Sequence, residues 1–219
     1  MTINKKQIRY LTSALAACLL LLTHFSLNAA MYGRKTFRGS GDGNRNVAIV
    51  ESAAQLQSTW SVTSALTTQA DLSLDSVQDN PSLEVTVDLT KLTTGFADRD
   101  PQVFSRSFLD FASTGSATFK LVNLNRSRTW VLNNEQKEEF SGIGELRLGS
   151  MADTVAISLN LTYLQQNDLT RGRMAGDLLH MVGDMSFRLS RLGIKIPQEA
   201  LLKLDDVIRL RFDAFASTQ

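Results

Sequence analysis

The sequence has few of the residues that build disulfides, metal centres and nucleophilic sites. Its 219 residues include one cysteine, Cys18, and two histidines, His24 and His180. One cysteine excludes an intrachain disulfide, and so few Cys and His residues exclude the zinc sites that need several of them. The fold is therefore held by burial of apolar side chains, which a chain of this length can supply.

Neither sign of charge is in excess. The chain has 23 basic and 22 acidic residues, and three of the basic ones (Lys5, Lys6 and Arg9) precede residue 31, so residues 31–219 carry 20 basic against 22 acidic groups. Nucleic acids and anionic lipids are bound through clustered Lys and Arg. The near-neutral net charge therefore predicts no nucleic-acid partner and gives no indication of a basic surface that binds anionic lipid.

Residues 1–30 have the organisation of a signal peptide. The basic start precedes an uncharged stretch over residues 11–22, and the small residues Ala29 and Ala30 follow it. We expect cleavage near Ala30 and a mature protein that is periplasmic or secreted. Cleavage there removes Cys18 and His24, so that His180 is the one remaining histidine.

Two alternative fates would keep this segment at a membrane. An uncleaved anchor over residues 11–27 is shorter than the roughly 20 residues of a spanning helix and contains hydroxyl side chains such as Thr23. Residues 15–18 spell a bacterial lipobox, in which Cys18 would be lipidated, but the apolar residues 19–22 would then be exposed at the new N-terminus. Membrane contact is expected only through such an uncleaved or lipidated N-terminus.

Beyond residue 60 the dominant pattern has a period of two. Apolar and polar residues alternate clearly over residues 83–89, 155–162, 185–190 and 208–213, and more weakly over residues 117–121 and 144–148. This alternation is typical of antiparallel strands with one buried face. In the last run we expect the apolar side chains to point inward and the polar ones outward. The inward set is Ile208, Leu210 and Phe212, and the outward set is Arg209, Arg211 and Asp213.

Helical signals are few and short. Asp100 followed by Pro101 predicts an N-cap with proline at the first helical position, and Phe104, Phe108 and Phe111 then recur at helical spacing.

Two further segments complete this organisation. Residues 197–204 are a second helix candidate, and residues 52–60 are interpreted as one or two helical turns. Residues 31–46, rich in Gly, Arg, Ser and Asn, are interpreted as a flexible leader. The predicted fold class is all-β with one or two short inserted helices.

Several segments, in order, resemble the signature of the YceI-like family. They are VDLTKLTTGFADRD (87–100), FLDF (108–111), SATFKL (116–121), GELRL (144–148), MSFRLSRLGI (185–194) and DVIRLRFDAFA (206–216). Arg191 and Gly193 match the family's Arg-x-x-aromatic-Gly segment, in which the aromatic position is Leu192 here. The resemblance covers about residues 60–216. Residues 46–68 alternate weakly and lack the family's opening motif and the histidine after it.

This resemblance implies an antiparallel, eight-stranded, lipocalin-like β-barrel over residues 47–219. It also implies an exported lipid-binding protein, not an enzyme, whose interior holds a long apolar ligand such as a polyisoprenoid or an isoprenoid quinone, with no other cofactor. Eight strands enclose either one slender ligand or only their own side chains. The alternative function is therefore a structural or interaction protein of the cell envelope with a solid barrel. The oligomeric state is left open.

In the first hypothesis, the inward apolar residues line the ligand site, and the aromatic helix face either lines the barrel mouth or is a stripe that the helix buries by packing on the barrel. The candidates are Val85, Val87, Leu89, Phe104, Phe108, Phe111, Phe119, Leu121, Leu146, Leu148, Val155, Ile157, Leu159, Phe187, Leu189, Ile208, Leu210 and Phe212.

No catalytic residue and no metal ligand is predicted. His180 lacks a nucleophile elbow or recognisable triad partners and is interpreted as a strand residue. Asp98 and Asp100 make a poor calcium site because Arg99 lies between them and no glycine-turned loop supplies further oxygens.

Overall fold

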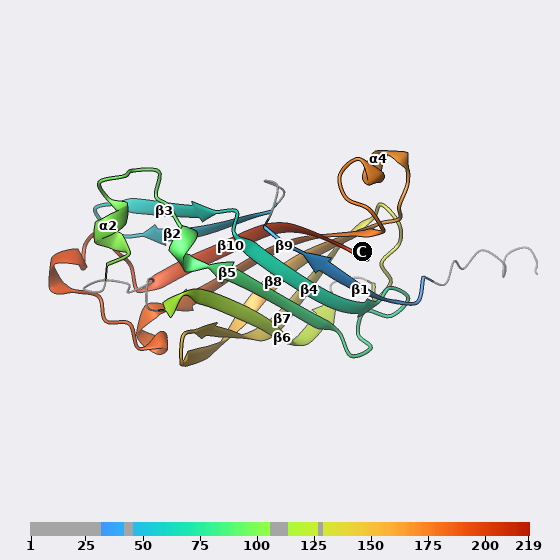
Figure 1. Cartoon of the computed structure of the whole chain (residues 1–219). Coiled ribbons are helices and arrows are strands. Elements are labelled where there is room, and N and C mark those ends of the chain that lie inside the picture. The colour runs from blue at the N-terminus through green and yellow to red at the C-terminus, as the bar shows by residue number, and fades with distance from the viewer. Residues whose placement is uncertain (1–31, 42–45, 106–113, 127–128) are drawn as a thin grey trace, which may run out of the picture. The chain divides into compact units, whose positions relative to one another are not determined.

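The computed structural model describes residues 32–41, 46–105, 114–126 and 129–219. In these ranges ten strand segments form one antiparallel sheet, and β1 also pairs with β10, so that the sheet closes into a barrel (Figure 1). The segments are β1 (Arg34–Gly39), β2 (Val47–Ala53), β3 (Ser58–Thr63), β4 (Leu66–Ser73), β5 (Ser82–Asp88), β6 (Ser116–Arg126), β7 (Lys137–Leu148), β8 (Met151–Leu164), β9 (Leu178–Arg188) and β10 (Val207–Ser217).

The ten segments correspond to eight strands of the barrel, because the first four segments are halves of two interrupted strands. β1 and β2 follow one another along β10, where Arg38 lies opposite Ser217 and Ala48 lies opposite Phe212. β4 pairs with β1, and β3 pairs with β2, so β3 and β4 together form the second interrupted strand. The expected antiparallel eight-stranded barrel is therefore confirmed.

The regular part of the barrel follows the period-two pattern. All six alternating runs lie on β5 to β10, except that Leu89 and residues 189–190 continue past the ends of β5 and β9. On β10, Ile208, Leu210 and Phe212 are buried while Arg209 and Arg211 are exposed, as their alternation predicts.

The N-terminal expectations are wrong in two places. Residues 34–39 of the expected leader form β1, whose Phe37 is fully buried, and residues 52–60 contribute to β2 and β3 rather than to helical turns. The physical reason is clear in β3, where the pattern is inverted. Ser61 and Thr63 are buried, whereas Trp60 and Val62 are exposed. A strand with polar residues on its inner face lacks the apolar alternation by which strands are recognised in a sequence.

The helical elements are shorter than expected. Among the described residues they are η1 (Leu89–Lys91), α2 (Asp100–Val103), α4 (Asp168–Arg171), η2 (Leu189–Leu192) and η3 (Gln198–Ala200). The candidate at residues 197–204 is reduced to η3 and a turn, while Phe108 and Phe111 lie outside the described residues. Within the described ranges, no helix is long and apolar enough to cross a membrane.

The N-cap assignment of Asp100 is also wrong. Arg99 occupies the N-cap position and makes no side-chain cap hydrogen bond. The carboxylate of Asp100 instead accepts hydrogen bonds from Thr93 Oγ1 at 2.6 Å and from the backbone N–H of Thr94 at 2.8 Å. Asp100 therefore ties the helix to the loop before it.

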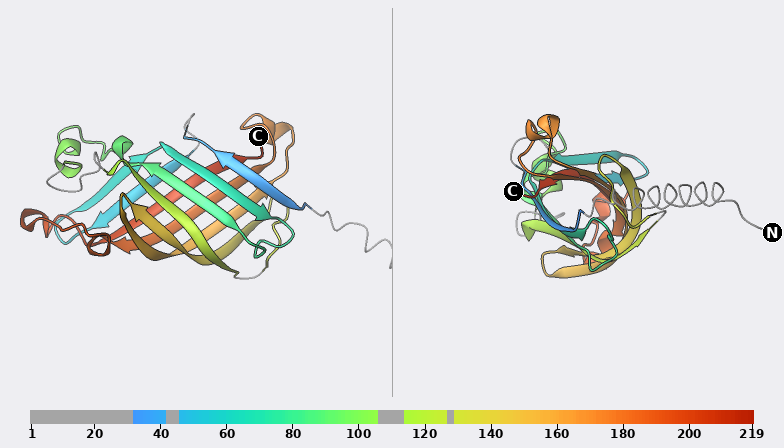
Figure 2. Two further views of the ribbon diagram at one scale, coloured as in Figure 1. Left: turned by 60° about the horizontal axis from the view of Figure 1, so that its bottom comes forward. Right: turned by 90° about the vertical axis from the view of Figure 1, so that its right-hand side faces the viewer.

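One half of the barrel interior is filled by its own side chains. Phe37 and Tyr163 meet edge to face, with 6.4 Å between ring centroids. The hydroxyl of Tyr163 donates a hydrogen bond to Asp177 Oδ2 at 2.9 Å, and the same carboxylate lies 2.9 Å from Lys35 Nζ. Tyr163 lies at the end of β8 that leads to α4, and the Asp177 carbonyl accepts from the backbone N–H of Thr218 near the C-terminus. Figure 2 shows the C-terminus at one end of the barrel.

Candidate functional site: an apolar cavity at one end of the barrel

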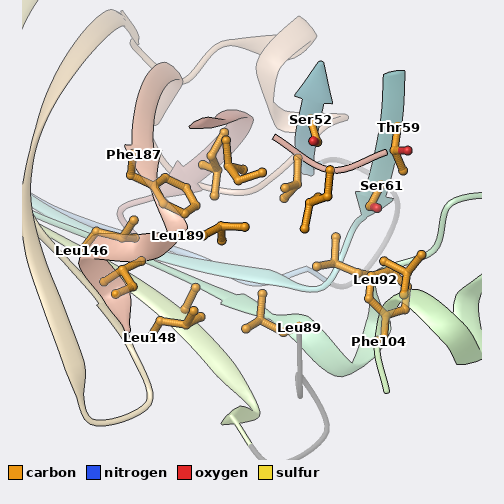
Figure 3. A pocket seen from close by; sticks show the side chains of 17 residues that line it. Ser52, Thr59, Ser61, Leu89, Leu92, Phe104, Leu146, Leu148, Phe187 and Leu189 are labelled. Atoms are coloured by element: carbon orange, nitrogen blue, oxygen red, sulfur yellow. The ribbon is translucent and has the colours of Figure 1, made fainter. Parts of the chain in front are cut away.

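An apolar cavity of about 60 Å³ lies in the other half of the barrel. It is enclosed by β2 and β3, by the connection from β5 to β6 and by the connection from β9 to β10 (Figure 3). The lining residues are Val50, Ser52, Thr59, Ser61, Leu89, Leu92, Val103, Phe104, Ala117, Leu146, Leu148, Phe187, Leu189, Leu192, Leu204, Ile208 and Leu210. All are apolar except for two serines and one threonine.

Two phenylalanines lie on the inner face just beyond the lining residues. Phe119 is the next inward residue on β6 after the lining residue Ala117, and Phe212 is the next on β10 after Leu210. Each ring packs where β7 or β9 has a glycine: a Cβ on Gly144 would lie 2.3 Å from ring atoms of Phe119, and a Cβ on Gly183 would lie 2.2 Å from Phe212 Cε1. Both rings are buried without lining the cavity.

Hydroxyl groups are confined to the wall formed by β2 and β3. Figure 3 shows Ser52, Thr59 and Ser61 together on these strands, opposite the leucines. Ser52 Oγ accepts a hydrogen bond from the backbone N–H of Asp205 at 2.9 Å, and Thr59 Oγ1 accepts one from Gln57 Nε2 at 3.0 Å. The cavity thus has one polar wall and otherwise apolar sides.

Carboxylates hold the connections that carry the lining residues. Asp88 caps η1 by accepting from the backbone N–H of Thr90 at 2.9 Å, which fixes the turn that buries Leu89 and Leu92. Burial raises the pKa of Asp100, but the hydrogen bonds from Thr93 and Thr94 outweigh it and hold this pKa below its ordinary value.

Asp206 holds the turn at η2 in the same way, by accepting hydrogen bonds. It accepts from the backbone N–H and the hydroxyl of Ser190, each at 2.8 Å. The backbone hydrogen bond from Ser190, together with those from its hydroxyl and from Arg188, holds the pKa of Asp206 below its ordinary value. Gly193 ends the turn at φ 71°, in the left-handed region that favours glycine.

The cavity gathers some of the residues predicted from sequence and leaves others out. Those that line it are Leu89, Phe104, Leu146, Leu148, Phe187, Leu189, Ile208 and Leu210. Those that are buried but do not line it are Val85, Val87, Phe119, Val155, Ile157, Leu159 and Phe212. Leu121 is half-buried and does not line it either.

Other lining residues were missed. Val50 and the hydroxyl residues belong to β2 and β3, whose inner faces are too polar to be recognised as strands. Leu92 and Leu192 were available signals: each follows a predicted inward leucine by three positions, which is the spacing of a 3₁₀ turn.

His180 lies outside this site. It is a β9 residue, as interpreted from the sequence, and its Nε2 is 2.8 Å from Asp213 Oδ1. Its ring stacks on Phe215, with 4.2 Å between centroids. Across the described ranges, no group of three or more His, Cys, Asp or Glu residues is placed to hold a metal ion.

A family model described as the YceI-like domain matches residues 43–216. The chain belongs to the YceI-like family. A comparison with curated proteins finds no match.

Solved structures share this YceI-like fold at low sequence identity. Burkholderia cenocepacia BcnA is 15% identical, with a TM-score of 0.60 over 80% of this chain and 98% of that one. A polyisoprenoid-binding domain from Saccharophagus degradans, implicated in plant cell wall breakdown, is 12% identical, with a TM-score of 0.59 over 84% and 99%. The Campylobacter jejuni YceI protein is 14% identical, with a TM-score of 0.54 over 70% and 81%.

Proposed function

We propose that this YceI-like barrel binds one slender apolar chain, of the polyisoprenoid or isoprenoid quinone class, with its end in the cavity. The carrying observation is a cavity with apolar sides and a single hydroxyl-bearing wall. Such a site suits a hydrocarbon chain with an oxygen-bearing group at one end. The family and the polyisoprenoid-binding neighbour support the same class of ligand.

The size of the cavity indicates how binding has to proceed. A single water needs roughly 10 to 15 Å³ of such volume, so a cavity of about 60 Å³ accepts only the tip of a long chain. A longer portion enters when the β2–β3 wall moves outward. That wall is held at its free edge by the bridge between Val62 and Thr93, with N···O distances of 2.8 and 3.1 Å.

We also propose that the protein acts outside the cytoplasm. This part rests on the signal-peptide pattern of residues 1–30, which lie outside the described residues. A carrier of apolar chains works between membranes or between a membrane and an enzyme, where an exported barrel shields its ligand from water. No catalytic step is proposed.

The second candidate is an envelope interaction protein with no ligand. The observation that favours it is the filled half of the barrel, where Phe37, Tyr163 and Met181 are at most 1% exposed. In that case the cavity is a packing defect of the loop end.

Two Leu→Phe variants on the inner face separate these functions. Leu210 lines the cavity, whereas Leu161 is buried in the filled half. We expect Leu210→Phe to keep the unfolding midpoint and to lose co-purified lipid, measured by solvent extraction and mass spectrometry. Leu161→Phe has no room, so it should cost about 1–3 kcal/mol and keep the lipid.

The outcome against binding is equally definite. If wild-type protein purified from its own envelope yields no apolar molecule, and Leu210→Phe destabilises the fold as much as Leu161→Phe, the cavity is a packing defect and the second candidate is correct.

A further inference from the structure

Exposed apolar side chains gather at the cavity end of the barrel. Leu56 is 70% exposed, Phe96 60%, Leu201 56% and Leu202 49%. We call these residues the apolar rim. They lie on three connections: β2 to β3, η1 to α2, and β9 to β10. Figure 1 shows these connections at the end that carries α2. Leu169, 89% exposed, lies in α4 at the other end.

Each exposed residue lies between or close to residues that line the cavity: Leu56 between Ser52 and Thr59, Phe96 between Leu92 and Val103, and Leu201 and Leu202 just before Leu204. The backbone N–H of Leu56 donates to the carbonyl of Leu202 at 2.9 Å, which joins two of the three connections. Leu204, two residues after Leu202, lines the cavity. The same stretch of chain thus presents leucines both to solvent and to the cavity.

Lysines lie on the same connections as the apolar rim. In the part of the chain that the structure describes, Lys91, Lys195 and Lys203 are exposed and make no ion pair. Two arginines at this end differ, since Arg188 pairs with Asp206 and Arg191 with Asp153. Lysines without an ion pair beside exposed leucines are placed to contact anionic headgroups.

Trp60 lies on β3, close to the connection that carries Leu56. It is 57% exposed on the outer face of β3, opposite Glu51 and two positions from the strand end at Ser58. Tryptophan is favoured at the boundary between lipid and water, where its ring is apolar and its N–H remains hydrogen-bonded.

We propose that the cavity end of the barrel docks on the surface of a lipid bilayer that contains anionic phospholipid. Leu56, Phe96, Leu201 and Leu202 enter the boundary between headgroups and acyl chains, and the lysines contact phosphates. Docking places the cavity against the membrane, so an apolar chain passes between them without crossing water. This contact is made by the barrel, in contrast to the sequence-based expectation of contact only through the N-terminus. Only the transfer step rests on the proposed function.

Matched single-tryptophan proteins test the orientation. Trp60 and Trp130 are the two tryptophans of the chain, and both are replaced by Phe. Phe96→Trp then adds a reporter at the cavity end, and Leu169→Trp adds one at the opposite end. With vesicles of phosphatidylcholine and phosphatidylglycerol, we expect a blue shift and quenching by brominated lipid for Phe96→Trp and neither for Leu169→Trp. The N-terminal segment is common to both full-length proteins, so it does not account for a difference between them.

Matched serine variants test the rim itself. Leu201→Ser combined with Leu202→Ser should weaken the vesicle-dependent fluorescence change of the Phe96→Trp reporter by about tenfold or more in lipid concentration, because two leucines leave the boundary. Leu169→Ser in the same reporter should change nothing. Lys195→Glu combined with Lys203→Glu should weaken the response to anionic vesicles and leave the response to pure phosphatidylcholine unchanged.

Three results would overturn docking. They are equal quenching of both reporters, an unchanged response in the leucine variant, and a rim that mediates self-association in sedimentation velocity without any vesicle response. Co-purified lipid is measured in parallel. A barrel that docks but carries no lipid defeats the proposed function and leaves docking standing, while one that carries lipid without docking does the reverse.

Discussion

The ring of Phe212 occupies the space that a side chain at Gly183 would need. A Cβ on Gly183 would lie 2.2 Å from Cε1 and 2.3 Å from Cζ of Phe212, whose side chain is 1% exposed. Gly183 lies opposite Phe212 in the ladder between β9 and β10. The glycine therefore gives the ring of Phe212 room to lie against β9.

Gly183→Ala should destabilise the protein by about 1–3 kcal/mol, because a buried ring has to shift to admit the methyl group. Gly172→Ala is the control. Gly172 has helical backbone angles, and its nearest contact would be 3.7 Å away, so this change should be neutral or stabilise by up to about 1 kcal/mol. Urea unfolding measures both. Equal stability of the two variants would show that the packing around Phe212 is loose.

Asp100→Ala should lower stability by about 0.5–1.5 kcal/mol through loss of the hydrogen bonds from Thr93 and Thr94. Amide exchange over residues 93–104 should become faster. Asp100→Ser distinguishes this arrangement from an N-cap. Serine is a good cap, but it is too short to hold both threonines, so it should behave like alanine. Wild-type stability in Asp100→Ser would restore the cap assignment.

Asp177→Asn should be destabilised at neutral pH by about 1–3 kcal/mol, because Lys35 loses its ion pair. Burial raises the pKa of Asp177, but hydrogen bonds from Gln166, Lys35 and Tyr163 outweigh it and lower the pKa below its ordinary 3.8.

The sign of the pH dependence follows. A lowered pKa means that the carboxylate stabilises the fold above pH 3.8 and loses this contribution as the pH falls below that value. The stability difference between wild type and Asp177→Asn should therefore shrink in acid. Asp168→Asn is the control, since its carboxylate is 99% exposed. A difference that stays constant down to pH 2 would contradict this role for the carboxylate.

Processing of the N-terminus should yield a mature chain that begins at or near Met31. The basis is the basic start, the short apolar core and the Ala29-Ala30 end of residues 1–30. N-terminal sequencing and intact mass of the protein recovered from the periplasm or medium test it. A chain that starts at residue 1, or a lipidated Cys18, would contradict it.

The sequence predicts the barrel where apolar side chains face inward. On β8, Val155, Ile157 and Leu159 are buried and alternate with exposed residues, so period two and burial coincide. On β3 the rule fails, because Ser61 is buried and Trp60 is exposed. Inward hydroxyls and outward apolar residues are what a ligand wall and a docking surface require, so the pattern is least informative where we propose function.

The extent of the site could not be predicted from periodicity alone. Leu210 and Phe212 belong to one inward set, yet the first lines the cavity and the second is buried without lining it. What separates them is Gly183 on the neighbouring strand, which determines where the ring lies. Alternation specifies the face of a residue, whereas its depth in the barrel depends on its neighbours across the ladder.

Closure of the barrel brings together residues from distant parts of the chain. The backbone N–H of Phe215 donates to Asn46 Oδ1 at 2.9 Å, across 169 positions, and Arg38 pairs with Ser217. Contacts of such separation carry a large loop-closure entropy cost. Until β10 is in place, β1 and β9 each have an unpaired sheet edge that is open to aggregation. Ile208 and Leu210 of this last strand line the cavity, so the binding site is complete only once β10 has joined the sheet.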